Sequence, residues 1–468
     1  MSFRLALSLF AAIRLILPDD RGVTATVVAI ALPAMIGFGA LGAETGAWFT
    51  IKLRNQSAAD AAAISAAYEV VGGKTDVIYD LTPAASEAAT RNGYTGIAPV
   101  VGYPYSDAIV KNGVAVTLQQ TQGTLLAAMF LSNVTLVTKA VAVIEVLDNP
   151  CILALGTAAT DVELANSTSL FMPNCSIAAN SISSAAIELA SSSSITAATL
   201  VTAGEISMAG NPIDPTAPPA EFSLAAPATI GAPSIADPYA STLTHSYLTA
   251  GMPTLTRCTP KGLGGGAVIY SGGCFIPGNT LKQTSIGLTA NTQISGDLTI
   301  VTGQTFDLLP GTYWITGGLS IQSNGVLKCS TCDNALGKGV TIILTMQANP
   351  IGTISMALGA IVNLNAPSSG PFPGLLIIQD SNGLPAGTSY ASPYSSIGGA
   401  PSATLNGLIY FPKTSMAFHG QPSTSDPKCL LLVVGTLNVD ATSSLDAGGC
   451  TKAGLTNLPV IYKIALAE

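Results

Sequence analysis

Eight cysteines are the residues whose chemistry is easiest to constrain in this chain. They could form disulfides, or the motif Cys329–Cys332 could supply half of a zinc site. Zinc is disfavoured, because a second CxxC motif is missing and the chain has only two histidines, His245 and His419. Pairing of neighbours in the sequence predicts four disulfides: Cys151 with Cys175, Cys258 with Cys274, Cys329 with Cys332, and Cys429 with Cys450.

Acidic side chains could support carbohydrate chemistry. Glycoside hydrolysis needs two carboxylates that face each other across the substrate, and a lyase needs clustered acids for calcium together with a basic residue. In this chain no Lys or Arg accompanies an acidic pair, so we expect no catalytic residue, no metal and no cofactor. The acids of the C-terminal half are isolated from one another in the sequence: Asp297, Asp307, Asp333, Asp380, Asp426, Asp440 and Asp446.

Other features with possible chemistry have simpler structural interpretations. His419 could be catalytic, but a single histidine on a loop is more often structural. Asp380 ends an apolar strand and is expected to cap a turn. The glycine-rich run 262–266 lacks the lysine, serine and helix of a phosphate loop. Tyr313 and Trp314 could stack on a sugar, although packing within the fold is the expected role.

The elements that would position these residues follow from the composition. Only 9% of the 468 residues are charged, 48% are hydrophobic, and 47 are glycine. A disordered chain would carry more charge and less apolar surface, so a fold of short strands and tight turns is favoured. The net charge is −8 and no cluster of Lys or Arg stands out, which argues against nucleic-acid binding through a basic surface.

One apolar segment, residues 22–43, carries no charge and is long enough to cross a bilayer as a helix. Residues 1–21 are expected to form an amphipathic segment on the cytoplasmic side. Gly42 and Gly46 give the helix a small face for close packing against another helix, unless that face simply contacts lipid. A cleaved signal peptide is the competing interpretation, but its apolar core would be shorter. Disulfides would place the rest of the chain in an oxidising compartment.

Three features lie near the N-terminus. Arg21-Gly22 opens the apolar helix with its central Pro33, Glu44 precedes the aromatic pair Trp48-Phe49, and the run 53–63 follows. Together these features resemble TadG-like proteins, of the TadE/TadG group of Flp (tight adherence) pilus assembly. The resemblance implies a single-pass anchor in a bacterial inner membrane that contacts other pilus assembly proteins through its helix. It also places the C-terminal region in the periplasm.

Two departures from that group bear on function. Pseudopilins of the group carry a Glu shortly after the processing glycine, and residues 23–27 contain none. Cleavage after Gly22, as in a minor pilin of the filament, is therefore not expected. The segment Asp440–Ser444 approaches the metal motif of a von Willebrand A domain, but no helix pattern follows it, so a surface turn is expected.

Five further motifs resemble the β-helical half of TadG-like proteins that lack a von Willebrand A domain: Leu309–Tyr313, Gly339–Ile342, Ala366–Pro371, Gly374–Asp380 and Asn406–Pro412. Beyond residue 149, short alternating segments recur about every ten residues with no helix-length pattern between them. A sandwich or a solenoid would fit, and we expect a right-handed parallel β-helix.

The expected domain order is a small α+β region at 44–148, first solenoid coils at 149–205, a Pro-rich linker over the surface at 206–257, and the main solenoid at 258–468. The expected function is structural and not enzymatic: a membrane-anchored component of Flp pilus assembly. The alternative is an envelope protein with a β-helix that binds or cleaves carbohydrate. Self-association of the chain is left open.

Overall fold

The computed structural model describes residues 20–108, 110–124, 128, 132–165, 167–254, 256–277, 281, 283–333, 336–345, 352–381, 394–399, 404–420, 429–445, 449–456 and 458–467. Most of the expected amphipathic segment 1–21, together with Asp426 and Asp446, lies outside these residues. The chain forms two compact units. Unit 1 comprises residues 1–145 and 464–468, and unit 2 comprises residues 146–463.

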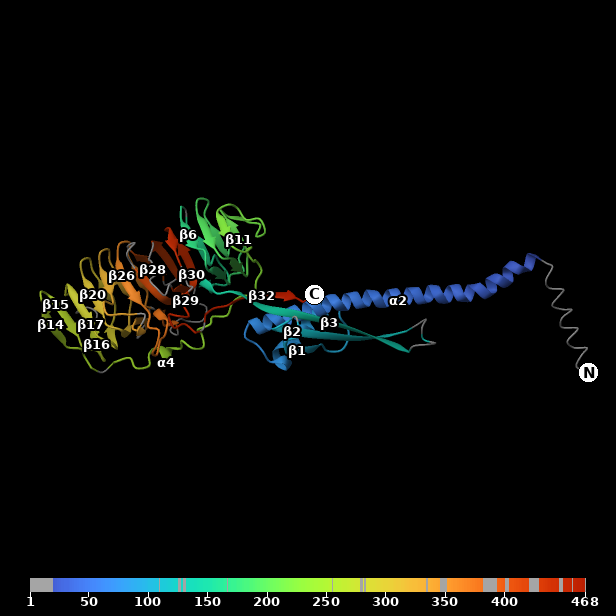
Figure 1. Ribbon diagram of the computed structural model, residues 1–468, viewed down its shortest axis with the longest axis horizontal. Coiled ribbons are helices and arrows are strands. Elements are labelled where there is room, and N and C mark those ends of the chain that lie inside the picture. Colours follow the sequence, from blue (N-terminus) through green and yellow to red (C-terminus); the bar gives the residue numbers. More distant parts are fainter. Residues whose placement is uncertain are drawn as a thin grey trace, which may run out of the picture. The chain divides into compact units, whose positions relative to one another are not determined.

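Unit 1 is organised by one long helix, α2 (Asp20–Val71), in which the expected membrane span and the alanine-rich stretch after it are continuous (Figure 1). Pro33 lies inside this helix. The apolar side chains of its N-terminal half are exposed: Ile30 is 75% and Phe38 is 78% accessible. This is a helix long and apolar enough to cross a membrane.

The C-terminal half of α2 is packed. Its buried face consists of Asn55, which is 1% exposed, and of alanines that are each 0% exposed: Ala58, Ala59, Ala62, Ala63, Ala66 and Ala67. Alanine favours the helix and lets its backbone approach a neighbouring element closely. The neighbours are η1 (Val77–Leu81), α3 (Thr82–Arg91) and β2 (Gly113–Gly123).

The sheet of unit 1 has four strands in the order β1-β2-β3-β32, with β1 (Val100–Tyr105), β3 (Asn133–Asp148) and β32 (Ile461–Leu466). β1 and β3 both pair antiparallel with β2. After β32, the amide of Ala467 donates to the Val141 carbonyl at 2.8 Å. The sequence analysis placed these last residues in the main solenoid. In the structure, β32 is instead the edge strand of the small sheet. A strand can pair with any open sheet edge, regardless of its place in the sequence.

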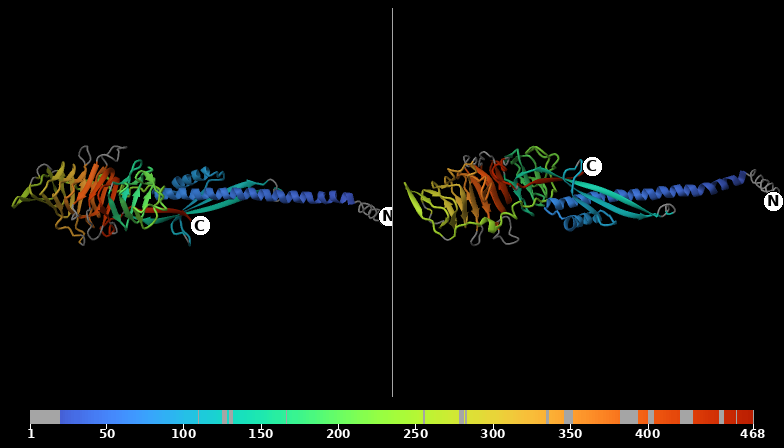
Figure 2. Two further views of the ribbon diagram at one scale, coloured as in Figure 1. Left: turned by 90° about the horizontal axis from the view of Figure 1, so that it is seen from above. Right: turned by 60° about the horizontal axis from the view of Figure 1, so that its bottom comes forward.

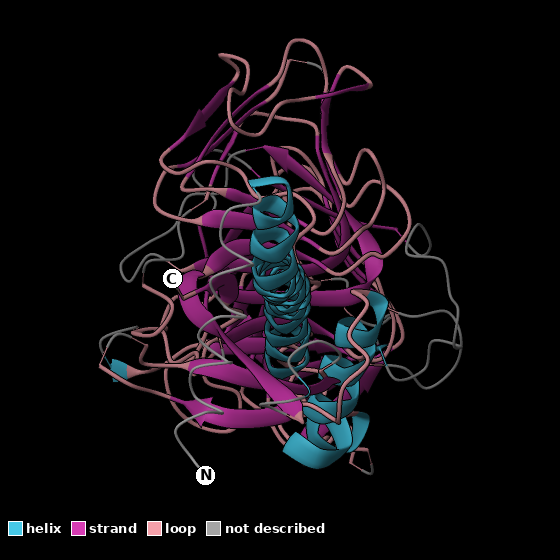
Figure 3. Ribbon diagram, turned by 90° about the vertical axis from the view of Figure 1, so that its right-hand side faces the viewer, coloured by secondary structure: helices cyan, strands magenta, loops and turns pink. Residues whose placement is uncertain are grey.

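Unit 2 is mostly β-structure with large parallel sheets; outside α2, η1, α3 and the short α4 (His245–Leu248), the described chain is almost entirely strands and loops (Figure 3). The strands up to residue 224 are β4 (Pro150–Ala154), β5 (Val162–Leu164), β6 (Ser169–Met172), β7 (Ser176–Ala179), β8 (Ile187–Leu189), β9 (Ser194–Ala197), β10 (Leu200–Thr202), β11 (Ile206–Met208), β12 (Asn211–Pro212) and β13 (Phe222–Leu224).

The strands from residue 260 to residue 365 are β14 (Pro260–Gly264), β15 (Ala267–Tyr270), β16 (Cys274–Pro277), β17 (Ser285–Leu288), β18 (Thr292–Ser295), β19 (Leu298–Ile300), β20 (Thr305–Leu308), β21 (Gly311–Ile315), β22 (Leu319–Ile321), β23 (Val326–Lys328), β24 (Val340–Leu344), β25 (Ile354–Met356) and β26 (Ile361–Asn365). They are followed by β27 (Leu375–Gln379), β28 (Tyr394–Gly399), β29 (Thr404–Gly420), β30 (Leu430–Val439) and β31 (Ser443–Ser444).

From β17 to β25, each strand pairs in parallel with the third strand further along the chain, which produces three ladders. The long strand β29 then pairs with the last strand of each ladder: β26, β27 and β28. Because the strands pair in parallel register, similar side chains from successive strands line up in columns. One inward column contains Ile286, Phe306, Leu327 and Val362, each at most 1% exposed.

The strands that come first in unit 2 are not at the start of its ladders. β30 pairs with β4 and β5, and β31 pairs with β6, so the strands after residue 149 continue the ladders beyond residue 439. One uninterrupted parallel ladder runs β16-β18-β21-β24-β27-β29-β30-β4-β7-β10. We call it the long ladder; its strands stack side by side (Figure 2).

The Pro-rich segment expected as a linker at 206–257 starts inside the sheets. β11 pairs in parallel with β8, and β13 with β9. Only residues 225–254, which we call the strap, leave the ladders for most of their length; Thr229 still forms an isolated bridge with Val201. β13 and β14 are terminal strands of their sheets, so the strap connects the two ends of the stacked strands.

Candidate functional sites

The first candidate site is the exposed half of α2. A Cβ atom added to Gly42 or Gly46 would meet no described atom within 4 Å, so this small face is uncovered in the chain. The hydroxyls nearby are satisfied inside the helix, since Thr45 Oγ1 donates to the Leu41 carbonyl at 2.8 Å and Thr50 Oγ1 to that of Gly46 at 2.9 Å. Such internal bonds suit a helix in hydrocarbon, where no water can replace them.

The second candidate is the set of cysteines. The structure joins them in the four pairs that neighbouring positions predict: Cys151 with Cys175, Cys258 with Cys274, Cys329 with Cys332, and Cys429 with Cys450. Among the described residues, no cluster of three or more His, Cys, Asp or Glu could hold a metal ion.

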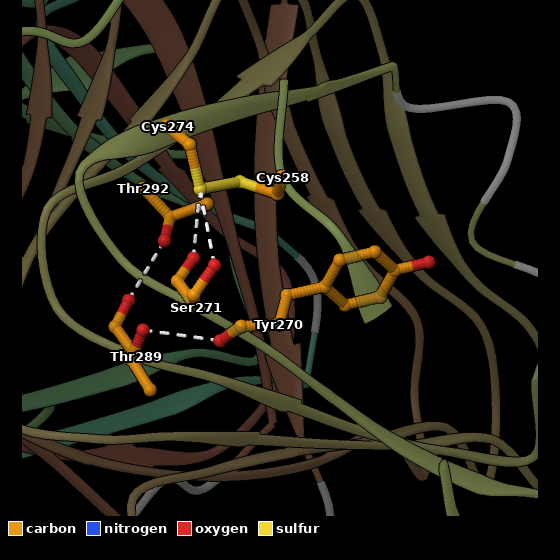
Figure 4. The surroundings of a disulfide bond; sticks show 6 residues. All are labelled: Cys258, Tyr270, Ser271, Cys274, Thr289 and Thr292. Atoms are coloured by element: carbon orange, nitrogen blue, oxygen red, sulfur yellow. Dashed lines mark hydrogen bonds between the residues drawn. A yellow bond between two sulfur atoms is a disulfide. The ribbon is translucent and has the colours of Figure 1, made fainter. Parts of the chain in front are cut away.

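The bond between Cys258 and Cys274 ties the chain just after the strap to the first strand of the long ladder, β16 (Figure 4). Local hydrogen bonds hold the neighbouring turn between β17 and β18 and join it to the end of β15. Thr289 Oγ1 donates to the Tyr270 carbonyl at 3.0 Å, and Thr292 Oγ1 to the Thr289 carbonyl at 2.7 Å. Both sulfurs are buried in this setting, which makes the bond a structural tie.

The acids named in the sequence analysis bind separate turns, and Asp307 does so from within strand β20. Asp297 accepts the Gly318 amide at 2.7 Å, and Asp307 accepts the Ser330 amide at 2.9 Å and its hydroxyl at 2.6 Å. The Asp333 backbone pairs with Lys338 across a tight bend. Each of these acids therefore organises a turn between strands.

The histidines each contact one aspartate. His419, at the end of β29, bonds through Nδ1 to Asp440, which follows β30. His245 Nδ1 lies 2.5 Å from Oδ2 of Asp380, and Thr345 Oγ1 donates to the same oxygen at 2.9 Å. Asp380 is 3% exposed and lies buried at the end of β27, in contact with the strap through His245.

The two aromatic candidates for sugar stacking are packed inside unit 2. Tyr313 is 1% exposed and donates its hydroxyl to the carbonyls of Leu288 and Leu309 at 2.8 and 2.6 Å. Trp314 is 2% exposed and donates Nε1 to the Leu248 carbonyl of the strap at 2.8 Å. The glycine-rich run 262–266 forms the turn of the β14–β15 hairpin, where three successive glycines have positive φ.

The sequence analysis expected a Pro-rich segment over the surface, but it did not predict the residues that the strap contacts. The contacts of the strap follow the long ladder from one end to the other: first Asn180 beyond β7, then Tyr410 on β29, Asp380 after β27, and Trp314 on β21. A signal for it existed in the alternation of prolines with polar and aromatic residues, but nothing in that pattern names the partner strands.

One group of polar contacts of the strap surrounds Asp237. Its Oδ1 accepts the Tyr239 amide at 2.9 Å and its Oδ2 accepts the Tyr410 hydroxyl at 2.7 Å. The rings of Tyr239 and Tyr410 meet edge to face, 5.7 Å apart. Burial raises the pKa of the Asp237 carboxyl, which the bond from Tyr410 and the nearby charge of Lys413 partly counteract.

A pocket of about 360 Å³ opens beside this contact. Its wall mixes apolar strap residues such as Ile235 and Leu243 with polar groups, and the exposed Lys413 of β29 lies at it. The other polar residues are Asn180, Asp237, Thr244, Ser381 and Tyr410. Carboxylate, amide, hydroxyl and ammonium groups together can hydrogen-bond a ligand that is rich in hydroxyl groups.

Comparisons of the chain with protein-family models, with curated proteins and with solved structures each gave no match.

Proposed function

We propose that this chain is a structural, membrane-anchored component of Flp (tight adherence) pilus assembly, held in a bacterial inner membrane with its C-terminal region in the periplasm. The observation that carries the proposal is α2. Its apolar half is exposed and uncharged between residues 22 and 43, while its other half is built into a folded unit. The N-terminal features that resemble TadG-like proteins lie on this same helix.

In this proposal, α2 docks against other assembly proteins within the membrane. The uncovered face at Gly42 and Gly46 supports such contact, because small residues let two helices approach closely in lipid. The rigid continuation of the helix into unit 1 would transmit the position of the membrane partner to the folded region outside.

We further propose that the three ladders of unit 2 are the faces of a right-handed parallel β-helix. The repeated pairing of each strand with the third strand along the chain supports this view. Four disulfides suit the oxidising periplasm. The turn-forming roles of Asp297 and Asp307 support a structural rather than a catalytic function.

Counting surface Flp pili in a deletion strain tests the role. Complementation should restore pili with the full-length chain and not with unit 1 alone. Since β32 completes the sheet of unit 1, the shortened chain should join residues 1–145 to residues 461–468 through a flexible linker. Membrane fractionation must show that both chains are present at equal levels. Normal numbers of pili in the deletion strain would refute the proposal.

The docking face can be tested with a matched control. Gly42→Leu with Gly46→Leu should reduce the number of pili, because added bulk separates the helices. Gly37→Leu adds the same side chain at another open position of α2, about 140° around the helix from Gly42, and should leave piliation unchanged. Equal effects of both changes would mean that the face has no special role.

Carbohydrate binding is a second candidate, favoured by the polar pocket beside the strap. Full-length protein in detergent would be titrated with envelope oligosaccharides, with Lys413→Ala as the pocket variant and Lys452→Ala as an exposed control outside the pocket. Binding that only Lys413→Ala weakens would support this candidate. An absence of binding, or equal loss in both variants, would count against it.

A further inference from the structure

One of the four disulfides differs from the others in exposure. The six cysteines of the other three bonds are between 0% and 7% exposed. Cys329 and Cys332 are only partly buried, and the two residues between them, Ser330 and Thr331, are both exposed. The turn that carries this bond follows β23 at the surface of unit 2, so solvent reaches it from outside.

The same bond also closes by far the shortest loop. Its cysteines are 3 positions apart, whereas the other pairs are separated by 24, 16 and 21 positions. In the chain-entropy model a disulfide stabilises the fold by restricting the unfolded chain, and this restriction grows with loop length. The bond between Cys329 and Cys332 therefore contributes least to holding unit 2 together.

The turn is held in place by contacts that do not involve its sulfurs. The Cys329 amide donates to the Asn363 carbonyl at 3.1 Å, which continues the ladder from β23 to β26. Ser330 is bound through its amide and hydroxyl to Asp307. The Asp333–Lys338 bridge closes the following bend with bonds of 2.8 and 2.9 Å. None of these contacts uses a cysteine side chain, so none of them requires the disulfide.

We propose that Cys329 and Cys332 form a reversible thiol–disulfide exchange site, which reacts with a dithiol while the rest of unit 2 stays folded. A thiolate of the dithiol attacks one of the two sulfurs, forms a mixed disulfide, and releases the other cysteine as a thiolate. The second thiolate of the reagent then closes its own disulfide and releases the first cysteine. Two electrons pass from the dithiol to the chain, and both cysteine thiolates take up a proton when they become thiols.

Dithiothreitol is a suitable probe on the full-length protein in detergent. The protein is treated without denaturant, quenched at intervals with N-ethylmaleimide, digested and analysed by mass spectrometry. We expect the peptide with Cys329 and Cys332 to gain two labels at least about tenfold faster than any other cysteine, because exchange requires access to the sulfur. Oxidised dithiothreitol should restore the bond. Equal labelling of all four pairs, or earlier labelling of a buried pair, would overturn the proposal.

A second measurement separates exchange from a structural role. The double variant Cys329→Ser with Cys332→Ser should lose the fast labelling phase and keep the unfolding midpoint of the parent. Wild-type protein reduced only at this pair should show the same midpoint, and this result does not depend on the folding of a variant. A large fall in the midpoint after selective reduction would make the bond a structural element and contradict the proposal.

Discussion

The buried face of the helix in unit 1 is built from small side chains, whereas the core of unit 2 is built from large ones. The buried face of α2 consists mainly of alanines, whereas the ladders of unit 2 are filled by Ile, Leu, Val and Phe. Two buried columns illustrate the difference: Ala59, Ala62 and Ala66 in unit 1, and Ile286, Phe306 and Leu327 in unit 2.

The difference predicts opposite weaknesses. An alanine face brings a helix backbone close to its neighbours, so enlargement of a side chain there forces elements apart. Large side chains between ladders fill space that the parallel backbone cannot collapse into, so truncation there leaves a cavity. Unit 2 also holds all eight cysteines, whereas unit 1 has no cysteine and depends on non-covalent contacts.

The largest effect is expected for Phe306→Ala in unit 2. Phe306 is 0% exposed and lies in register with Ile286 and Leu327. Truncation of a buried phenylalanine costs about 3–5 kcal/mol in unfolding free energy. Denaturant unfolding followed by the fluorescence of the buried Trp314, with Trp48 replaced by Phe, measures it. Phe171→Ala is the control, since Phe171 is 52% exposed, and a similar loss there would refute the cavity argument.

The next effect depends on pH and concerns Asp161, which is 0% exposed where β5 meets β30. Its Oδ2 accepts the Ser181 amide at 2.8 Å, and its Oδ1 has no partner among the described residues. Burial raises the pKa of this carboxyl to about 7. Between pH 4 and pH 7 the unfolded chain loses this proton while the folded chain keeps it, so the fold is progressively destabilised as pH rises.

Asp161→Asn removes that penalty. Relative to wild type, the variant should gain stability as pH rises from 4 to 8, by up to about 4 kcal/mol for a shift of about three pKa units. Denaturant unfolding at a series of pH values gives the comparison, and wild type at pH 4 serves as the reference. A stability difference that does not change with pH would show that the carboxyl is not protonated in the folded state.

The local features of both units could be predicted from the sequence, but the pairing of strands that are distant in the sequence could not. Periodicity and composition indicated α2 and the short strands, and neighbouring positions sufficed to pair cysteines such as Cys258 and Cys274. The missed features all join distant residues. β32 pairs with β3 across more than three hundred residues, and β30 pairs with β4, which comes much earlier in the chain.

These connections could not be derived because parallel strands of similar composition are interchangeable locally. Leu432 pairs with Ile152, but any apolar residue in an alternating segment would satisfy the same backbone bonds. The contacts of the strap were missed for a related reason. Asp237 and His245 look like isolated polar residues, and only the fold brings them to Tyr410 and Asp380.

A smaller effect is expected for enlargement in unit 1. Ala62 is 0% exposed on the buried face of α2, and Ala62→Leu should cost about 1–3 kcal/mol through overpacking. Hydrogen exchange of peptides from β2, which packs against α2, would detect the loosening. The control is Ala61→Leu at a partly exposed position of the same helix. If both changes were equally harmless, the close approach of helix and sheet would not limit unit 1.

The most local effect is expected for the strap, which beyond residue 232 is attached to the ladders mainly by single side-chain contacts. Tyr410→Phe removes the hydroxyl that donates to Asp237 at 2.7 Å and leaves the ring contact with Tyr239 in place. The loss of one hydrogen bond to a charged group costs about 1.5–3 kcal/mol when the acceptor is ionised, and less when it is protonated. Since burial raises the pKa of Asp237 and the Tyr410 hydroxyl lowers it, the variant should raise this pKa further.

The cost of Tyr410→Phe should therefore be greater at pH 8 than at pH 4, because the hydroxyl stabilises the ionised carboxylate. Hydrogen exchange of strap peptides at the two pH values measures the local effect, which unfolding of the whole chain would underestimate. Tyr247→Phe is the control: its hydroxyl donates to the Pro371 carbonyl, which does not titrate, and the side chain is 43% exposed. A similar pH dependence in both variants would mean that the strap is held by its apolar contacts, such as Leu248, and not by the Asp237 carboxylate.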